Sequence, residues 1–156
     1  MNRCIPPLFC FLFPLLMTAQ VDDPYLQALN GTFHGAVIMK VDKQGRLVMD
    51  FHDDGKRFRQ DIAPVHMLDP DLITYSPEEN AIVLNCRQEN SHCLTKEVFK
   101  LGLLRSSSRS TLPCPPDDVN GVRSIVAMET FLKGMQSTAA ATPTETPRPS
   151  TRIKGR

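Results

Sequence analysis

The chain has 156 residues, with 18 basic and 17 acidic side chains, no Trp and two Tyr. This near balance of charge argues against nucleic acid as the main partner, because phosphate backbones select basic surfaces. The scarcity of aromatic side chains also leaves few platforms on which bases or sugars could stack. The length suits a single domain after N-terminal processing.

Residues 1–19 have the order of a secretory signal peptide. Arg3 supplies positive charge, residues 4–17 are apolar, and Ala19 stands at a small-residue cleavage point. The alternative is an uncleaved anchor, but the apolar part is interrupted by prolines and is shorter than the roughly 20 residues of a membrane span. We expect cleavage near Ala19 or Gln20. The mature chain is then expected to be neutral, secreted or periplasmic, and without a transmembrane segment.

Residues 21–30 predict a short helix that docks on the domain. Asp22 or Asp23 can cap it, and Pro24 suits its first turn. Gly31 is expected to end it. Its apolar face consists of Tyr25, Leu26 and Leu29. Asn30 opens an Asn-Gly-Thr sequence that matches the N-glycosylation acceptor, but a helix stop is the preferred interpretation.

The next part of the chain predicts an antiparallel meander. Residues 33–41, 46–52 and 56–62 alternate between apolar and polar side chains, and turns containing Gly45 and Gly55 separate them. In this pattern one face is buried and the other faces water. The side chains expected to point inward in the second and third strands are Leu47, Met49, Phe51, Phe58 and Ile62.

Residues 81–99 are the segment around which the fold is expected to be organised. The apolar run 81–84 lacks alternation, which is typical of a strand covered on both faces. Cys86 and Cys93 bracket a polar loop, and in an exported chain this spacing predicts a disulfide. Before it, residues 63–71 break the strand pattern and residues 72–75 form a short strand. After it, residues 94–104 predict one or two strands, and residues 106–110 predict a loop.

Residues 117–133 predict the main helix. Asp117 or Asp118 can cap it, apolar residues repeat at helical spacing, and Lys133 and Gly134 are expected to end it. The apolar stripe is centred on Val122, Ile125, Val126 and Phe131. The strands are the surface on which this helix is expected to pack. Residues 20–135 thus form the predicted domain, and residues 136–156, rich in Thr, Pro and Ala, are expected to be disordered.

The order of these elements resembles a pleckstrin-homology-like barrel, in which a C-terminal helix plugs one end of the sheet. The chain is also similar to small secreted bacterial domains of unknown function. Residues 69–75, the segment 81–86, Cys93 and the final helix carry this resemblance. It implies an α+β, mostly β fold with about six or seven short antiparallel strands. Lys40, Lys43 and Arg46 lie at the first hairpin, but binding of lipid headgroups is not carried over.

The sequence offers no catalytic motif and indicates no cofactor or metal. There is no G-x-S-x-G elbow, and the clusters at residues 52–54 and 69–71 lack the spacing of a metal loop. A zinc site at His92 and Cys93 is the alternative to the disulfide. An oxidising compartment favours the disulfide. Cys114 is the odd cysteine of the mature chain. A spare or intermolecular cysteine is preferred over a nucleophile.

Two basic groups remain as candidate sites. Lys56, Arg57 and Arg59 flank Phe58, and Arg105 and Arg109 flank the serine run. Either group could bind an anion or an acidic partner. The competing interpretation, an ordinary solvated strand face and loop, is preferred.

Three functions are compatible with these patterns. The first is a secreted, non-catalytic binding or structural module that recognises a protein or peptide, with a sheet edge as one route. The second is a carrier of a small apolar ligand, with a cavity lined by Met39, Met49, Met67 and Met128. The third is a hydrolase with an unrecognised site.

Overall fold

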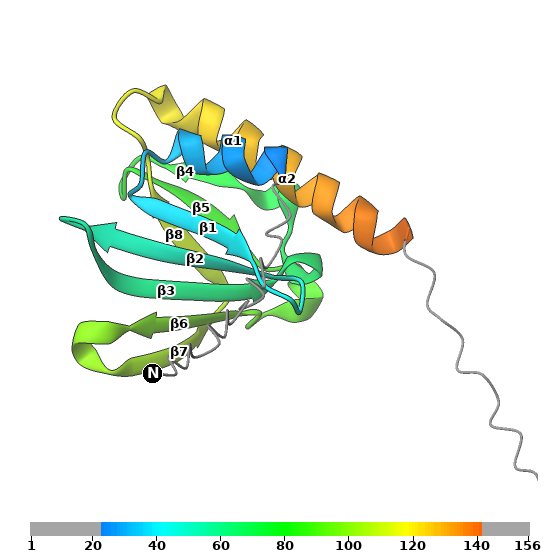
Figure 1. The fold of residues 1–156 in the computed structure, drawn as a ribbon, viewed down its shortest axis with the longest axis horizontal. Coiled ribbons are helices and arrows are strands. Elements are labelled where there is room, and N and C mark those ends of the chain that lie inside the picture. Colours follow the sequence, from blue (N-terminus) through cyan, green and yellow to red (C-terminus); the bar gives the residue numbers. More distant parts are fainter. Residues whose placement is uncertain (1–22, 142–156) are drawn as a thin grey trace, which may run out of the picture.

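The computed structural model describes residues 23–141. The predicted signal peptide and residues 142–156 of the predicted tail lie outside this range. Within it, neither helix combines the length and apolar character that a membrane crossing requires. The described chain folds into eight antiparallel strands in two sheets, with a short N-terminal helix and a long C-terminal one (Figure 1). The predicted fold class, antiparallel strands closed by a C-terminal helix, is therefore confirmed.

The larger sheet has five strands in the order β1-β2-β3-β6-β7. Its strands are β1 (Val37–Val41), β2 (Arg46–Asp53), β3 (Lys56–Pro64), β6 (Leu94–Val98) and β7 (Leu103–Ser107). The two predicted turns join β1 to β2 and β2 to β3. Gly45 and Gly55 both have φ of 72°, the left-handed region in which glycine avoids a steric cost. Since β3 pairs with β6, the chain leaves this sheet after β3 and returns to it later.

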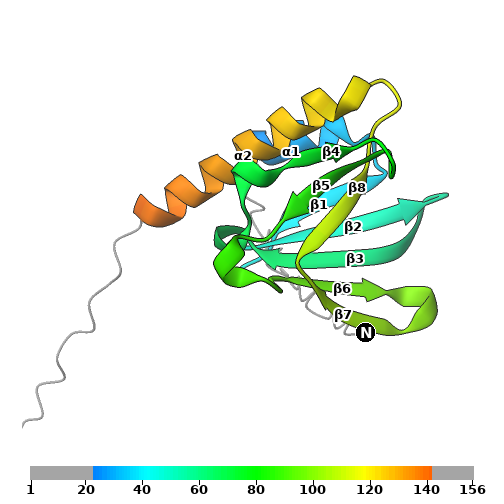
Figure 2. The same ribbon diagram turned by 180° about the vertical axis from the view of Figure 1, so that it is seen from behind.

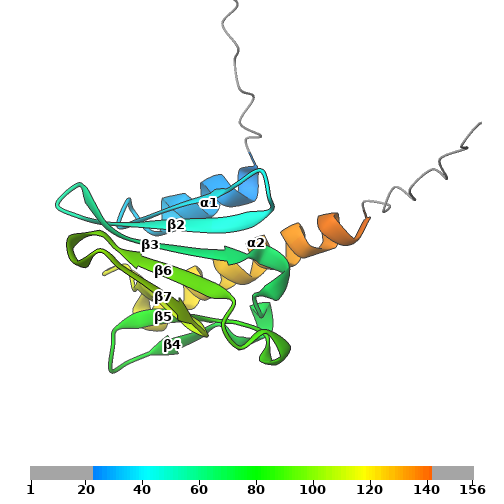
Figure 3. The ribbon, with the colours of Figure 1, turned by 90° about the horizontal axis from the view of Figure 1, so that it is seen from below.

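The smaller sheet has three strands in the order β4-β5-β8. They are β4 (Thr74–Ser76), β5 (Ala81–Asn85) and β8 (Arg109–Pro113). All four residues of the run 81–84 are buried, as predicted for a strand covered on both faces. In Figure 3 the strands follow one another from β2 through β3, β6 and β7 to β5 and β4, with α2 behind them. Three-residue 3-10 turns connect several elements: η1 (Val65–Met67), η2 (Pro70–Leu72), η3 (Gln88–Asn90), η4 (Phe99–Leu101) and η5 (Val119–Gly121).

Two details of the predicted strands are wrong. Residues 106–110 are not a loop, because β7 runs to Ser107 and β8 begins at Arg109. Ser110 is fully buried, and its hydroxyl donates to the carboxylate of Asp61 on β3. A serine-rich composition predicts a loop only when the hydroxyls face water, and here a buried partner satisfies one of them.

The second correction concerns the face of β3. A register shift after Phe51 leaves Phe58 without a partner directly opposite, because Phe51 pairs with Arg59 and His52 with Arg57. Phe58 packs against the core, as predicted. Beyond the irregularity, however, Asp61 shares the inward face with Met49, whereas Ile62 pairs with Val48 on the other face. The extra residue therefore reverses the expected orientation of Ile62 and turns Arg59 and Asp61 inward.

Helix α1 (Pro24–Thr32) begins at the predicted cap, because the Asp23 carboxylate accepts from the amide of Tyr25 at 2.9 Å. It does not end at Gly31. It continues to Thr32, and the chain turns at His34 and Gly35, where φ is positive. The Asn30 side chain donates to the carbonyl of Met39 and accepts from its amide, at 2.9 and 2.7 Å. Asn30 thus occupies the outer edge of β1 as another strand would.

Helix α2 (Val122–Ala141) starts later and ends later than predicted. The buried Asp118 carboxylate accepts from the amides of Arg123 and Ser124 at 3.0 and 2.8 Å, so Asp118 caps the helix through η5. Residues 136–141, expected to be disordered, form its last turns. The Gln136 amide donates to the carbonyls of Val65 and Leu68, at 2.9 Å each, which anchors this end.

The buried stripe of α2 differs from the predicted one. Val122 and Val126 are exposed by 60 and 57 %, whereas Met128, Phe131 and Leu132 are fully buried. Helix α2 packs against α1 as well as against η1, η2 and β4, and Figures 1 and 2 show both helices on the same side of the strands. The expectation that α2 meets the sheet alone is therefore wrong, because α1 also covers the core beside it.

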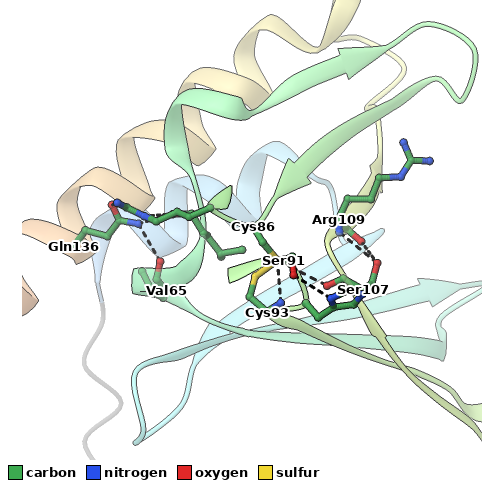
Figure 4. Close-up of a disulfide and its surroundings, with 10 residues drawn as sticks. Val65, Cys86, Ser91, Cys93, Ser107, Arg109 and Gln136 are labelled. Atoms are coloured by element: carbon green, nitrogen blue, oxygen red, sulfur yellow. Dashed lines mark hydrogen bonds between the residues drawn. A yellow bond between two sulfur atoms is a disulfide. The ribbon is translucent and has the colours of Figure 1, made fainter. Parts of the chain in front are cut away.

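The predicted disulfide between Cys86 and Cys93 is present, with an S–S distance of 2.10 Å. It joins the residue after β5 to the residue before β6, across the loop that contains η3. The Cys86 amide donates to the carbonyl of Ser108 at 2.8 Å, so the bridge also holds the corner between β7 and β8. Figure 4 shows the bridge between this corner, at Ser107 and Arg109, and Gln136 of α2.

Candidate functional site

An open groove of about 860 Å³ lies between the two sheets. The five-stranded sheet contributes residues of β2, β3 and β6, and the three-stranded sheet contributes residues of β5 and β8. Its lining consists of Ala36, Phe51, His52, Asp53, Phe58, Arg59, Glu79, Ala81, Lys96, Val98, Lys100, Arg109, Thr111 and Pro113. This volume falls within the range of about 300–1,000 Å³ typical of ligand sites.

Two aromatic rings form the apolar part of this groove. Phe51 and Phe58 meet edge to face, with ring centroids 6.4 Å apart. The irregularity between β2 and β3 places Arg59 opposite Phe51, so the unpaired Phe58 lies next to the residue that faces the Phe51 ring. The guanidinium of Arg59 lies 3.6 Å from the centroid of the Phe51 ring. This cation–π contact fixes a positive charge directly beside the apolar surface.

A cluster of charges around the buried Asp61 ties the two sheets together in the wall of the groove. The fully buried Asp61 lies 3.1 Å from Nε of Arg59 and 3.9 Å from Nζ of Lys96. The Ser110 hydroxyl donates to Asp61 at 2.5 Å. Arg59 also donates to the carbonyl of Thr111 at 2.7 Å, so β3 and β8 are joined by two polar links.

Burial dominates the electrostatics of this cluster. It raises the pKa of Asp61, although the Ser110 hydroxyl and the neighbouring cations act in the opposite direction. Burial also lowers the pKa values of Arg59 and Lys96, against the attraction of Asp61. Each group therefore loses solvation that its partners only partly replace. A ligand carboxylate at this wall would add a counter-charge to cations that share a single buried carboxylate.

The mouth of the groove is biased toward positive charge. The lining holds four cationic side chains, namely Arg59, Lys96, Lys100 and Arg109, against the carboxylates of Asp53 and Glu79. Arg109 pairs with Glu79 at 2.6 Å. No carboxylate of the described residues forms an ion pair with the exposed Lys100. The groove therefore favours an anionic group over a cationic one.

The structure separates the basic residues singled out by the sequence. Arg59 and Arg109, from different candidate groups, come together in the groove. Arg57 lies on the other face of the sheet, where it contacts Asp50 at 3.1 Å and stacks over Phe99. Lys56 and Arg105 do not line the groove. Arg105 lies beside it, because its cross-strand partner on β6 is Lys96.

Sequence reasoning missed Lys96 and Lys100. The alternation of Lys96, Val98 and Lys100 places two cations and an apolar residue along one wall of the groove. That alternation is visible in the sequence, but its meaning depends on β3 pairing with β6 rather than with β4. Only this non-sequential pairing places Lys96 opposite Asp61.

The groups considered for nucleophilic or metal chemistry are differently placed. The Cys114 thiol is partly buried, its Sγ lies 3.2 Å from the carbonyl oxygen of Asp118, and burial together with the Asp118 charge raises its pKa. A raised pKa favours the thiol over the reactive thiolate. Cys93 is oxidised in the disulfide, so it is not a free thiolate ligand. Residues 23–141 contain no group of three or more His, Cys, Asp or Glu side chains that could hold a metal ion.

Comparison with known proteins returns no match, since no family model, curated protein or solved structure is similar to this chain.

Proposed function

We propose that the protein is a non-catalytic binding module that recognises an acidic, extended segment of a protein or peptide partner. The observation that carries this proposal is the groove between the sheets, which four cationic side chains and two phenylalanine rings line together. A carboxylate would interact with the cations, and the methylene groups of the same side chain would lie against Phe51 and Phe58. Glutamate residues at alternate positions of an extended chain direct several such side chains to one face.

The roles of the cations differ in this proposal. Arg59 is held by Asp61, Thr111 and the Phe51 ring, so it serves as a fixed charge in the wall. Lys96 shares the buried Asp61 carboxylate with Arg59, whereas Lys100 is exposed, so Lys100 is the group expected to contact the partner's carboxylates first. Removal of Lys100 should weaken binding without disturbing the link between the sheets.

A carrier of a small apolar ligand receives less support. Met39, Met49 and Met128 are buried in the hydrophobic core, and none of the four methionines considered for such a cavity lines the groove. A hydrolase is also less supported, because Ser110 is fully buried and its hydroxyl donates a hydrogen bond to Asp61.

We also propose that the chain is exported and functions as a secreted or periplasmic protein. The disulfide supports an oxidising compartment. N-terminal sequencing of the protein recovered outside the cytoplasm should give a start at residue 20 or 21. A start at Met1 would contradict export with cleavage.

Fluorescence polarisation with a labelled heptapeptide, Glu-Val-Glu-Leu-Glu-Val-Glu, tests the binding proposal. The peptide in which Gln replaces each Glu should bind much more weakly, because it lacks the charges. Lys100→Gln should weaken binding of the acidic peptide by about threefold to fivefold, the upper range for an exposed ion pair. Lys56→Gln is the matched control, since Lys56 is an exposed lysine outside the groove. Equal binding of the Glu and Gln peptides, or no binding of either, would overturn the proposal.

A further inference from the structure

The two edge strands of the five-stranded sheet, β1 and β7, differ in whether another part of the chain covers their outer side. At one border, the Asn30 side chain pairs with both the amide and the carbonyl of Met39 on β1. At the other border, β7 pairs with β6 and with no other strand of the described chain. Figure 2 shows β7 at this border, below β6. Because alternate residues of an antiparallel strand direct their N–H and C=O groups to either side, β7 presents a row of available hydrogen-bonding groups.

Exposed leucines lie at and near this border, and Arg105 is the one charged residue of β7. Leu101 and Leu104 are exposed by 67 and 70 %, and Leu103 is also exposed. Soluble proteins commonly protect such edges with lysine, proline or a covering segment. An edge with available backbone groups and exposed leucines offers an added strand hydrogen bonds along the chain and apolar surface for its alternate side chains.

The charges near β7 indicate which kind of strand would fit. From residue 94 to residue 109 the chain carries Lys96, Lys100, Arg105 and Arg109 but only one acidic residue, Glu97. Arg105 is the cross-strand partner of Lys96, which lines the groove. The face of β7 that carries Arg105 therefore adjoins the groove wall. A second copy of this chain is disfavoured, because antiparallel pairing of β7 with itself brings two copies of Arg105 toward each other.

We propose that β7 binds an extended acidic segment of a partner protein as an additional antiparallel or parallel strand of the five-stranded sheet. This inference rests on the proposed function. It adds that the backbone of the same acidic partner forms hydrogen bonds with the backbone of β7. Acidic side chains on one face of the added strand lie toward Arg105 and the groove cations. Apolar side chains on its other face lie beside Leu104, which pairs with Glu97 on the face opposite to Lys96 and Arg105.

A chemical change in the peptide backbone tests this strand addition on the full-length mature protein. The probe is the acidic heptapeptide Glu-Val-Glu-Leu-Glu-Val-Glu, compared with two peptides of the same sequence that are N-methylated at odd or at even positions. Methylation removes backbone donors and leaves every charge in place. At least one methylated peptide should bind at least about tenfold more weakly, as expected when several backbone hydrogen bonds are lost.

Two measurements on the protein locate the contact. Amide hydrogen exchange in residues 103–107 should slow when the acidic peptide is bound, and Leu104→Ser should weaken binding about threefold through lost apolar contact. Unchanged thermal melting of Leu104→Ser would show that the variant is folded. Equal affinity of all three peptides, or unchanged exchange in β7, would overturn strand addition while leaving the charged groove intact. Equal affinity of the Glu and Gln peptides would instead overturn the groove proposal on which it rests.

Discussion

The position of helix α2 predicts a large difference between two substitutions on the same helix. Phe131 is fully buried, so Phe131→Ala removes a large side chain from an enclosed site. The expected loss is about 3–5 kcal/mol in the free energy of unfolding. Total stabilities of domains are about 5–15 kcal/mol, so this change should bring the protein close to unfolding. Val126→Ala should change the free energy of unfolding by less than about 0.5 kcal/mol, because Val126 is largely exposed and alanine favours helices.

Urea denaturation followed by circular dichroism measures both variants. The Phe131→Ala midpoint should fall strongly with an unchanged slope, which would indicate a loss of stability without a change in the surface exposed on unfolding. The Val126→Ala curve should superimpose on that of the wild type. Equal effects of the two substitutions, or a larger effect of Val126→Ala, would show that α2 buries the other face and would refute the described packing.

Four further predictions concern α2 and the turn that precedes it. Gly121→Ala should destabilise the protein by at least about 2 kcal/mol, because Gly121 has φ of 66° and its new Cβ would clash with Cδ1 of the buried Ile82. Gly134→Ala, with open space at its Cβ, should leave the melting temperature unchanged or raise it. Truncation after Ala141 should preserve the melting temperature, whereas truncation after Met135 should lower it by removing the Gln136 hydrogen bonds. Burial acts to raise the pKa of Asp118, but hydrogen bonds from Ser124 and Arg123 outweigh it and hold that pKa below the ordinary 3.8. At neutral pH, Asp118→Asn should therefore lower the free energy of unfolding by its full amount, and the difference from the wild type should disappear as the pH falls below 3.8. A difference in unfolding free energy that stays constant from neutral to acid pH would contradict this role of Asp118.

Much of the fold could be predicted because local patterns determine it. Period-two alternation and the turns at Gly45 and Gly55 predict β1 to β3, and the unbroken run 81–84 predicts a strand buried on both faces. The spacing of Cys86 and Cys93 predicts the disulfide. In each case the information lies within a few neighbouring residues, so one sequence suffices.

The errors arise where one segment depends on another that is distant in sequence. Ser110 belongs to a strand because it pairs with Leu84 of β5, and Asp61, 49 residues away, accepts the hydrogen bond of its buried hydroxyl. The register shift near Phe58 reverses the expected direction of Ile62. On α2, apolar residues occur at helical spacing on two faces, and only the packing against α1 shows that the face with Val122 and Val126 remains exposed.

The candidate site was only partly predictable for the same reason. Arg59 and Arg109 were recognised as basic, but they belong to separate groups in the sequence and meet only when β3 and β8 approach each other. Lys96 and Lys100 join them because β6 pairs with β3. Arg57 was an equally good candidate by composition, yet the alternation of the strand directs it to Asp50 on the other face.

Nuclear magnetic resonance of the isotopically labelled protein during titration with the acidic heptapeptide tests the central claim most directly. The account predicts that the perturbed amide signals gather on one contiguous surface, formed by residues 96–100 of the groove wall, residues 103–107 of β7 and residues 109–113 of β8. The Gln peptide should leave those signals nearly unchanged. Perturbations centred on the exposed face of α2 around Val122 and Val126, or no perturbation by the acidic peptide, would contradict the account.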